Sequence, residues 1–294
     1  MSDTPSNDDG SNQSSSIYRT SSYVCFDRGF AVAFLQASSV YYLTAILLHY
    51  VVPRALPVSS VQKGARKQGQ VCREATNCIG PLVVKAGMWT IVERMHASGY
   101  SLLYGGSMLT SVWHVPYMML VVVALDYLHD TWFYWTHRLL HTKALFSSVH
   151  RMHHESRVPT AFTGYSFHVV EAVIVFANEV IVCFLFPIHV RLHRFYHMYT
   201  TVIHNGGHAG YEIAPYIPSA EGLAFWAWRT LLMTLGAASR VSVSKGLNTV
   251  AHHDMHHRYP NVHFSLYMTH WDRLMGTEHP SYAAYVDSID SKQF

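Results

Sequence analysis

One stretch of the sequence joins an apolar run to a cluster of histidines: MMLVVVALDYLHDTWFYWTHRLLH, residues 118–141. It begins with eight uncharged apolar residues and ends with His137 and His141, four positions apart. Because side chains four apart share one face of a helix, these two imidazoles can point to one place. We predict a membrane-crossing helix over residues 108–128 that continues through His141.

The composition of the chain favours a membrane protein. Of 294 residues, 50% are hydrophobic and 13% charged, whereas about a quarter of a typical soluble domain is charged. The 22 histidines outnumber the 21 lysines and arginines, and the net charge of +3 is too small and scattered to indicate a nucleic-acid partner. The four cysteines show no paired-ligand spacing, which favours a reducing, cytosol-facing setting.

Hydropathy and charge divide the N-terminal part of the chain. Residues 1–22 are polar and predict a disordered tail. Residues 30–52 carry no formal charge and reach the length of about 20 residues that crosses a bilayer. Residues 54–73 contain five basic residues and no acid, so the positive-inside rule places them in the cytoplasm.

Further apolar segments predict several helices at the membrane. Residues 79–92 are short and contain Lys85, which suggests half of a hairpin or an interfacial segment. Residues 169–187 and 188–203 predict a helical hairpin with Pro187 at its tip; the acids Glu171 and Glu179 in its first arm indicate a functional or paired role. Residues 223–238 predict an interfacial helix. The fold class expected is an all-α membrane protein with several transmembrane helices.

Two more clusters repeat the histidine pattern. The second box, HRMHH, supplies His150, His153 and His154, and the third box, HDMHH, supplies His253, His256 and His257. With HRLLH they offer eight imidazoles, more than the four ligands of a structural zinc. We therefore predict a di-metal centre in a cytosol-facing, histidine-rich helical cap. Imidazole suits iron, copper, nickel and zinc, so ligand type alone leaves the metal open.

Other readings of the clusters fit less well. Chance or surface pH sensing is the plain alternative, although three clusters at helical spacing argue against it. A haem would need isolated histidines on facing helices. A zinc protease would need His-Glu-x-x-His, which the sequence lacks, and a metal transporter would place its ligands inside the spans.

The boxes and their flanks resemble the fatty acid hydroxylase/sterol desaturase superfamily over residues 126–277. The segments that carry the resemblance are DTWFYWTHRLLH, SVHRMHHES and HHDMHHRYPNVHFSLYMTHWDRLMGT. The resemblance implies a non-haem centre of two iron ions on the cytosolic side of the endoplasmic reticulum membrane, in a multi-pass protein. Such a centre activates O2 to hydroxylate or desaturate a lipid C–H bond. The protein would fix the metals, exclude water and aim one carbon at them.

The resemblance also brings in His204 and His208 as ligands, from the segment IHNGGHAGYE. No catalytic residue is expected beyond the metal centre. Metal-bound histidines give their second N–H to nearby groups, and the candidate outer partners are Asp130, His168, Glu171, His252, Asp254 and Asp272. The remaining histidines of the same stripe, His189, His193 and His197, are expected to be structural because they fall at the other end of the hairpin.

The domain plan expected is a membrane-anchoring region over 23–107, a catalytic domain over 108–280 and a C-terminal tail over 281–294. The chain contains neither the His-Pro-Gly-Gly haem motif nor a Gly-rich dinucleotide loop, so electrons should come from a separate b-type cytochrome or reductase. The ending THWDRLMGT is closer to the sterol-type branch, but fatty-acyl substrates stay open. The alternative is a non-catalytic metal-binding membrane protein derived from such an enzyme.

Overall fold

The computed structural model describes residues 29–212, 220–236 and 246–292; the tail predicted over 1–22 and Cys25 lie outside them. The described residues are mostly helical, as predicted. Their only sheet is the antiparallel pair of β1 (Ser59–Ser60) and β2 (Tyr211–Glu212). This pair ties the segment after the first helix to the end of α10 (Val190–Gly207).

The first predicted span forms a continuous helix. It consists of α1 (Gly29–Ile46), the π-helical turn η2 (Leu47–Val51) and α2 (Val52–Ala55). Ala33, Ala37, Tyr41 and Ala45 recur every four residues and are buried against α4 (Ile79–Ala97) and α10. Within the described residues, this helix alone is long and apolar enough to cross a membrane by length and composition.

The segment predicted over 79–92 is longer than expected. It forms the 19-residue helix α4, which follows α3 (Gln70–Asn77). Lys85 does not shorten it, because its Nζ lies 2.5 Å from Oε1 of Glu179 and both side chains are buried. The indole N–H of Trp89 donates to the other Glu179 oxygen at 2.6 Å. The charge that argued against a long helix is paired inside the bundle.

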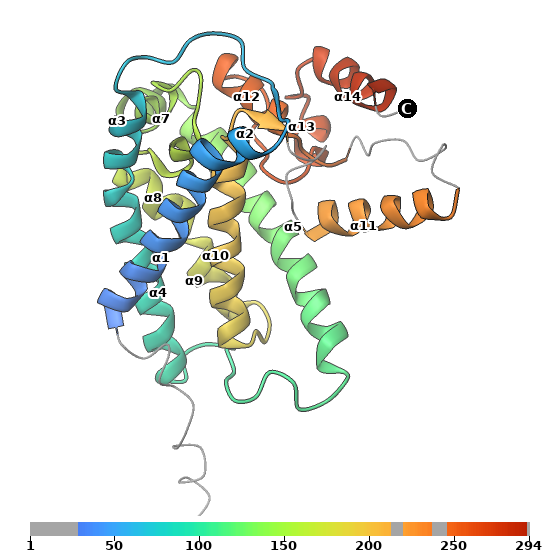
Figure 1. Ribbon diagram of the computed structural model, residues 1–294. Helices are drawn as coiled ribbons and strands as arrows, with labels where there is room; N and C mark the ends of the chain where they lie inside the picture. The colour runs from blue at the N-terminus through green and yellow to red at the C-terminus, as the bar shows by residue number, and fades with distance from the viewer. Residues whose placement is uncertain (1–28, 213–219, 237–245, 293–294) are drawn as a thin grey trace, which may run out of the picture.

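The central helix and the hairpin follow the prediction closely. Helix α5 (His114–Leu140) starts later than residue 108 but continues, as expected, up to His141. The first arm of the hairpin is broken into α8 (Val169–Phe176), α9 (Asn178–Ile181) and the 3-10 turn η5 (Val182–Phe184). Pro187 lies in the turn before α10, which confirms the predicted tip. Helices α1, α4, α8, α9 and α10 form the bundle, and α5 leans away from it (Figure 1).

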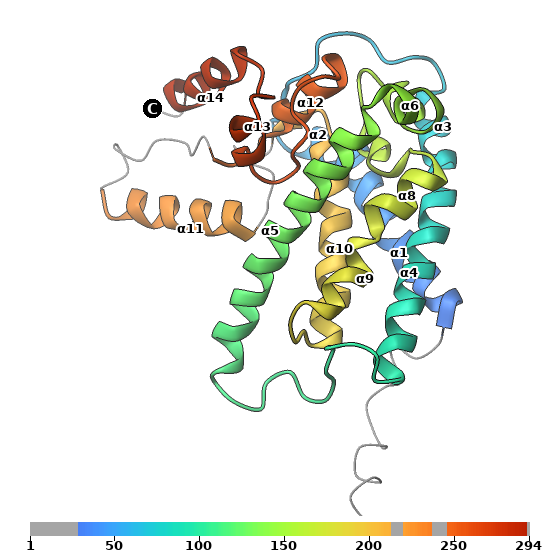
Figure 2. The ribbon, with the colours of Figure 1, turned by 180° about the vertical axis from the view of Figure 1, so that it is seen from behind.

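Short helices collect at one end of the bundle (Figures 1 and 2). They are α6 (Lys143–Leu145), the π-turn η3 (Phe146–His150), α7 (Arg151–His154), the 3-10 turn η4 (Ala161–Tyr165), α12 (Val250–Arg258), α13 (His270–Leu274) and α14 (Ser281–Lys292). Within the segment expected as a C-terminal tail, residues 281–292 form helix α14, with Tyr282 and Val286 buried.

Helix α11 (Ala220–Thr234) projects sideways from this end and touches α5 (Figure 2). It begins before the predicted residue 223 and ends at Thr234, and residues 237–238 of the prediction lie outside the described part of the chain. Leu223, Trp228 and Leu231 are exposed on it.

Candidate metal centre

Nine of the ten histidines proposed as ligands gather in two groups. Site A comprises His137, His141, His150, His154 and His256; site B comprises His153, His208, His253 and His257. Within each site, one ligand nitrogen from every ring lies within 4.8 Å of all the others. All nine side chains are buried except that of His141, which is half-buried.

Each of the last two boxes is divided between the sites. The outer pair of HRMHH, His150 and His154, belongs to site A, and its middle member His153 belongs to site B. In HDMHH the assignment is reversed, since His253 and His257 belong to site B and His256 to site A. Around a helix, positions i and i+4 lie about 40° apart, whereas positions i+3 and i+4 lie about 100° apart, so one box can serve two ions.

The nitrogen separations fit shared cations. In site A, Nε2 of His154 lies 3.2, 3.1 and 3.1 Å from the Nε2 atoms of His141, His150 and His256. A single Nε2 has one proton or one lone pair, so it cannot make three hydrogen bonds to other imidazoles. Ligands about 2.1 Å from one ion would lie about 3.0 Å apart at right angles and about 3.4 Å apart at the tetrahedral angle.

Site B has the same geometry. Nε2 of His208 is 2.8 Å from Nε2 of His253 and 3.4 Å from Nε2 of His153. The residues present therefore fit a pair of metal ions.

Burial keeps these rings neutral. Desolvation, followed by the neighbouring His137 and His208, lowers the pKa of His154 to about 3. Burial likewise holds the pKa of His253 and His257 well below the ordinary value, and nearby histidines add to the effect. Near neutral pH the rings thus offer lone pairs to a cation rather than positive charges.

In three of the nine rings the second nitrogen has a main-chain partner that fixes the ring direction. Nδ1–H of His137 donates to the carbonyl of Phe264 at 2.9 Å, and Nδ1–H of His256 donates to that of Val262 at 2.7 Å. Nδ1 of His208 lies 2.6 Å from the carbonyl of His204. With the proton on Nδ1, the lone pair of Nε2 points into the site.

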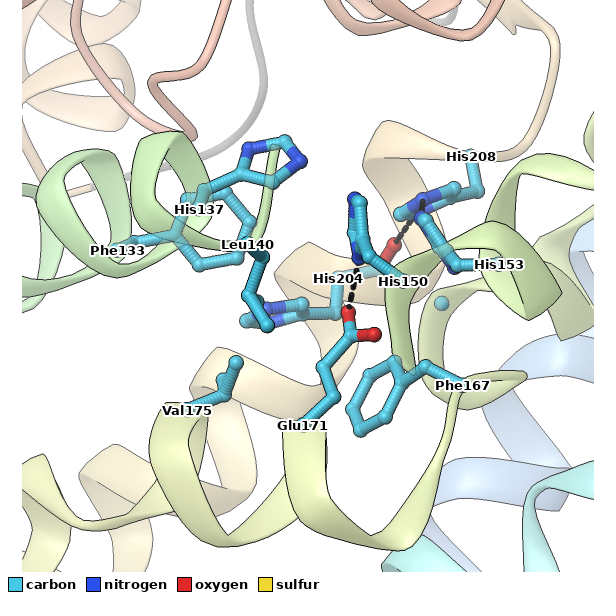
Figure 3. Close-up of a pocket in the computed structure, with 11 residues that line it drawn as sticks. Phe133, His137, Leu140, His150, His153, Phe167, Glu171, Val175, His204 and His208 are labelled. Atoms are coloured by element: carbon cyan, nitrogen blue, oxygen red, sulfur yellow. Dashed lines mark hydrogen bonds and ion pairs between the residues drawn. The ribbon is translucent and has the colours of Figure 1, made fainter. Parts of the chain in front are cut away.

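Of the proposed outer partners, Glu171 lies directly against a ligand ring, with Oε1 2.8 Å from Nδ1 of His150 (Figure 3). Asp130 and Asp272 instead accept backbone N–H groups of residues 264–268. Asp254 pairs with Arg258. His168 caps α8 by accepting the N–H of Val170.

His252 falls in a third group with His263 and Asp272. Nε2 of His263 accepts the backbone N–H of His279 at 3.0 Å, so the neutral ring carries its proton on Nδ1 and keeps no lone pair for a metal. Both oxygens of Asp272 are occupied by backbone N–H groups. In this group Asp272 and His263 support the neighbouring backbone by accepting its N–H groups.

His204 is the one proposed ligand that the structure leaves outside both sites. Its Nδ1 lies 2.9 Å from the carbonyl of Thr200, and its buried Nε2 has no hydrogen-bond partner. It lines a pocket beneath the sites together with the apolar Phe133, Leu140, Phe167 and Val175 and the acid Glu171 (Figure 3).

The structural histidines of the same stripe stay apart from the sites. His193 contacts the carbonyl of Glu179 at 2.7 Å, and His189 caps α10 by accepting the N–H of Arg191. His197 lies 3.8 Å from Glu179 Oε1.

Two features of the site had no sequence signal. The carbonyls of Val262 and Phe264 are main-chain groups, which any residue could supply. Gly164 allows close packing, because a Cβ there would lie 2.8 Å from Oδ1 of Asn205 and 3.1 Å from the carbonyl of His204.

Comparisons with known proteins identify the family of the chain. The fatty acid hydroxylase profile matches residues 121–277, more than half of the chain. Lathosterol oxidase of Mus musculus is 27% identical over 262 residues, which cover 84% of this chain and 73% of that protein. A Delta(7)-sterol 5(6)-desaturase of Gibberella zeae is 23% identical over 89% of this chain and 70% of its own length. No solved structure matches the chain. By the extent of the profile match and the nature of its relatives, the chain is an oxidoreductase of the fatty acid hydroxylase family.

Proposed function

We propose that the chain is a membrane-bound non-haem di-iron oxygenase that hydroxylates or desaturates a lipid, using O2 and electrons from a separate donor. The observation that carries the proposal is the convergence of five imidazoles on site A and four on site B, with two boxes divided between them. Such a division is of use only if two ions are held side by side.

Two bound iron ions would supply O2 activation for attack on an unactivated C–H bond. The nine histidines, eight of them buried, would hold these ions through neutral nitrogens, and Glu171 would keep the His150 ring aligned. Burial of the eight side chains would limit the access of bulk water to the ions. A structural zinc pair fits the ligand type as well, so the assignment to iron rests on the family.

The lining of the small pocket suits an apolar group next to the histidines. Four of its side chains, Phe133, Leu140, Phe167 and Val175, are apolar, while the histidines border one end (Figure 3). An apolar chain or ring held among α5, α8 and α10 would present one carbon to the ions. The relatives named as a lathosterol oxidase and a sterol desaturase favour a sterol-type substrate over a fatty-acyl one.

We infer a multi-pass protein of the endoplasmic reticulum membrane with both sites facing the cytosol. The basic segment 54–73 is linked through the β1–β2 pair to the end of α10 that bears His208. If this segment is cytosolic by the positive-inside rule, so is the cap. A separate b-type cytochrome or reductase would then reach it from that side. A glycosylation tag at the exposed Ser147 should stay unmodified; its glycosylation would reverse the topology.

The decisive experiment is lipid profiling of cells with and without the chain, with His153→Ala as the inactive variant and His193→Ala as the matched control. Both histidines are buried, but His153 belongs to site B and His193 to neither site. We expect an oxidised lipid that disappears with His153→Ala and persists with His193→Ala. An unchanged lipid profile, with good expression and reductase present, would favour the non-catalytic metal-binding alternative.

A further inference from the structure

The loop between α12 and α13 supplies the main-chain acceptors of site A. Its Val262 and Phe264 carbonyls receive the Nδ1–H groups of His256 and His137, which belong to different helices. The position of two backbone oxygens therefore determines how two of the five site A rings are oriented.

Two buried carboxylates hold this loop. Asp272 accepts the N–H of Phe264 at 2.9 Å through Oδ1 and that of Ser265 at 3.0 Å through Oδ2. Oδ1 of Asp130, on α5, accepts the N–H of Leu266 at 3.1 Å and of Tyr267 at 2.7 Å. Both aspartates have no exposed surface.

The loop conformation is one that needs such support. His263 has a φ of +60°, in the left-handed region that non-glycine residues rarely adopt. Such a residue persists where its surroundings fix it. Here the N–H of His263 donates to the carbonyl of Thr277 at 2.9 Å, and the Thr277 hydroxyl donates to Oδ1 of Asp272 at 2.7 Å.

We propose that Asp130 and Asp272 are positioning residues for site A, acting through the loop rather than on a ligand ring. The inference rests on the proposed function, because it assumes that sites A and B bind metal. Site B does not depend on the loop in this way: Nδ1 of its His208 contacts the carbonyl of His204, within α10. Loss of either aspartate should therefore weaken site A and spare site B.

Co2+ titration of the full metal-free chain in detergent tests this. The variants are Asp272→Asn and Asp130→Ala. In Asp272→Asn an amide NH2 replaces one of two carboxylate oxygens that both face backbone N–H groups. Asp130→Ala removes the single oxygen, Oδ1, that accepts the backbone N–H groups of the loop. Asp126→Asn is the matched control, since Asp126 lies on α5 one turn before Asp130, is equally buried and accepts the hydroxyl of Tyr196 instead. Wild type and the control should bind two Co2+. In each test variant the Kd of one ion should rise about 10- to 100-fold, the usual effect of losing outer-shell support.

Two backgrounds identify the affected ion. In His257→Ala, which weakens site B, adding Asp272→Asn should remove the remaining tight Co2+. In His141→Ala, which weakens site A, adding Asp272→Asn should leave the Kd of the remaining tight Co2+ unchanged. Retention of site B also reports that the variant is folded, and hydrogen exchange at residues 264–268 should accelerate.

The outcomes separate the two proposals. A wild-type chain that binds no Co2+ would overturn the proposed function. A wild-type chain that binds two, with Asp272→Asn losing neither ion or both equally, would overturn the positioning role alone. An equal loss of Co2+ affinity in the control Asp126→Asn would also overturn the positioning role.

Discussion

His204 and His208 provide a direct test of the site, because they are four residues apart on α10 and both buried, yet only His208 belongs to a site. Their spacing suggests equal roles, whereas their surroundings differ. Nε2 of His208 lies 2.8 Å from Nε2 of His253, while Nε2 of His204 has no hydrogen-bond partner. We expect His208→Ala to lose one metal ion and His204→Ala to keep both.

The size of the effect follows from the ligand count. Site B has four imidazoles, so His208→Ala leaves three. Losing an outer-shell partner weakens metal binding about 10- to 100-fold, so losing a direct ligand should exceed about 100-fold, or about 2.7 kcal/mol. His204→Ala keeps the backbone carbonyl that contacts Nδ1 of His208, so the site B ring stays oriented.

The assay is metal content after dialysis of each variant against a fixed low concentration of free Fe2+ without oxygen. Thermal unfolding of the metal-free variants serves as the control, because removing either buried ring leaves a cavity that costs a few kcal/mol. Equal metal loss in both variants, or loss confined to His204→Ala, would refute the division into sites A and B.

Three further predictions follow from particular contacts. Glu171→Gln replaces the carboxylate that lies 2.8 Å from Nδ1 of His150 by a neutral amide, so the Kd of the site A ion should rise about 10- to 100-fold in a Co2+ titration, and an unchanged Kd would rule out that Glu171 aligns the His150 ring. Lys85→Met leaves Glu179 buried without its cation and should lower the free energy of unfolding, measured by chemical denaturation, by about 3–5 kcal/mol. The double variant Lys85→Met, Glu179→Leu should recover this free energy, because it removes the unpaired carboxylate as well. Burial lowers the pKa of His154 to about 3 in the folded chain, so below pH 6.5 only the unfolded state takes up this proton. This ring alone should lower the free energy of unfolding of the metal-free chain by up to about 1.4 kcal/mol per pH unit, in addition to the effect of the other buried rings, and His154→Gln should reduce the measured slope by up to that amount.

Much of the helix layout follows from the sequence because apolar length and histidine spacing are local properties. Residues 30–52 and the continuation of α5 to Leu140 were predictable, as was the turn at Pro187. The extent of α4 was not, since Lys85 argues against a long apolar helix until its partner Glu179, 94 residues away, is known.

For the site, the sequence indicates which histidines are candidate ligands but not how their rings and partners are oriented. Spacing places histidines on a stripe, but it does not give the direction of each ring, so His204 could not be separated from His208. Nor does a sequence show where a carboxylate is directed: Asp272 was expected to contact a ligand ring, yet it holds the backbone beside one. Main-chain acceptors such as the Phe264 carbonyl carry no residue-type signal at all.

The wide separation of the ligands along the chain has a consequence for biosynthesis. Site A joins His137 to His256, so it cannot form until the third box has left the ribosome. The bundle helices can associate earlier, because they precede the third box. If the chain binds metal as proposed, insertion would follow synthesis of the third box and would attach residues 246–292 to an assembled bundle, and the binding energy would add to their stability. Iron-starved cells should accumulate a chain that proteases cut in this C-terminal part first; equal resistance with and without iron would argue against late loading.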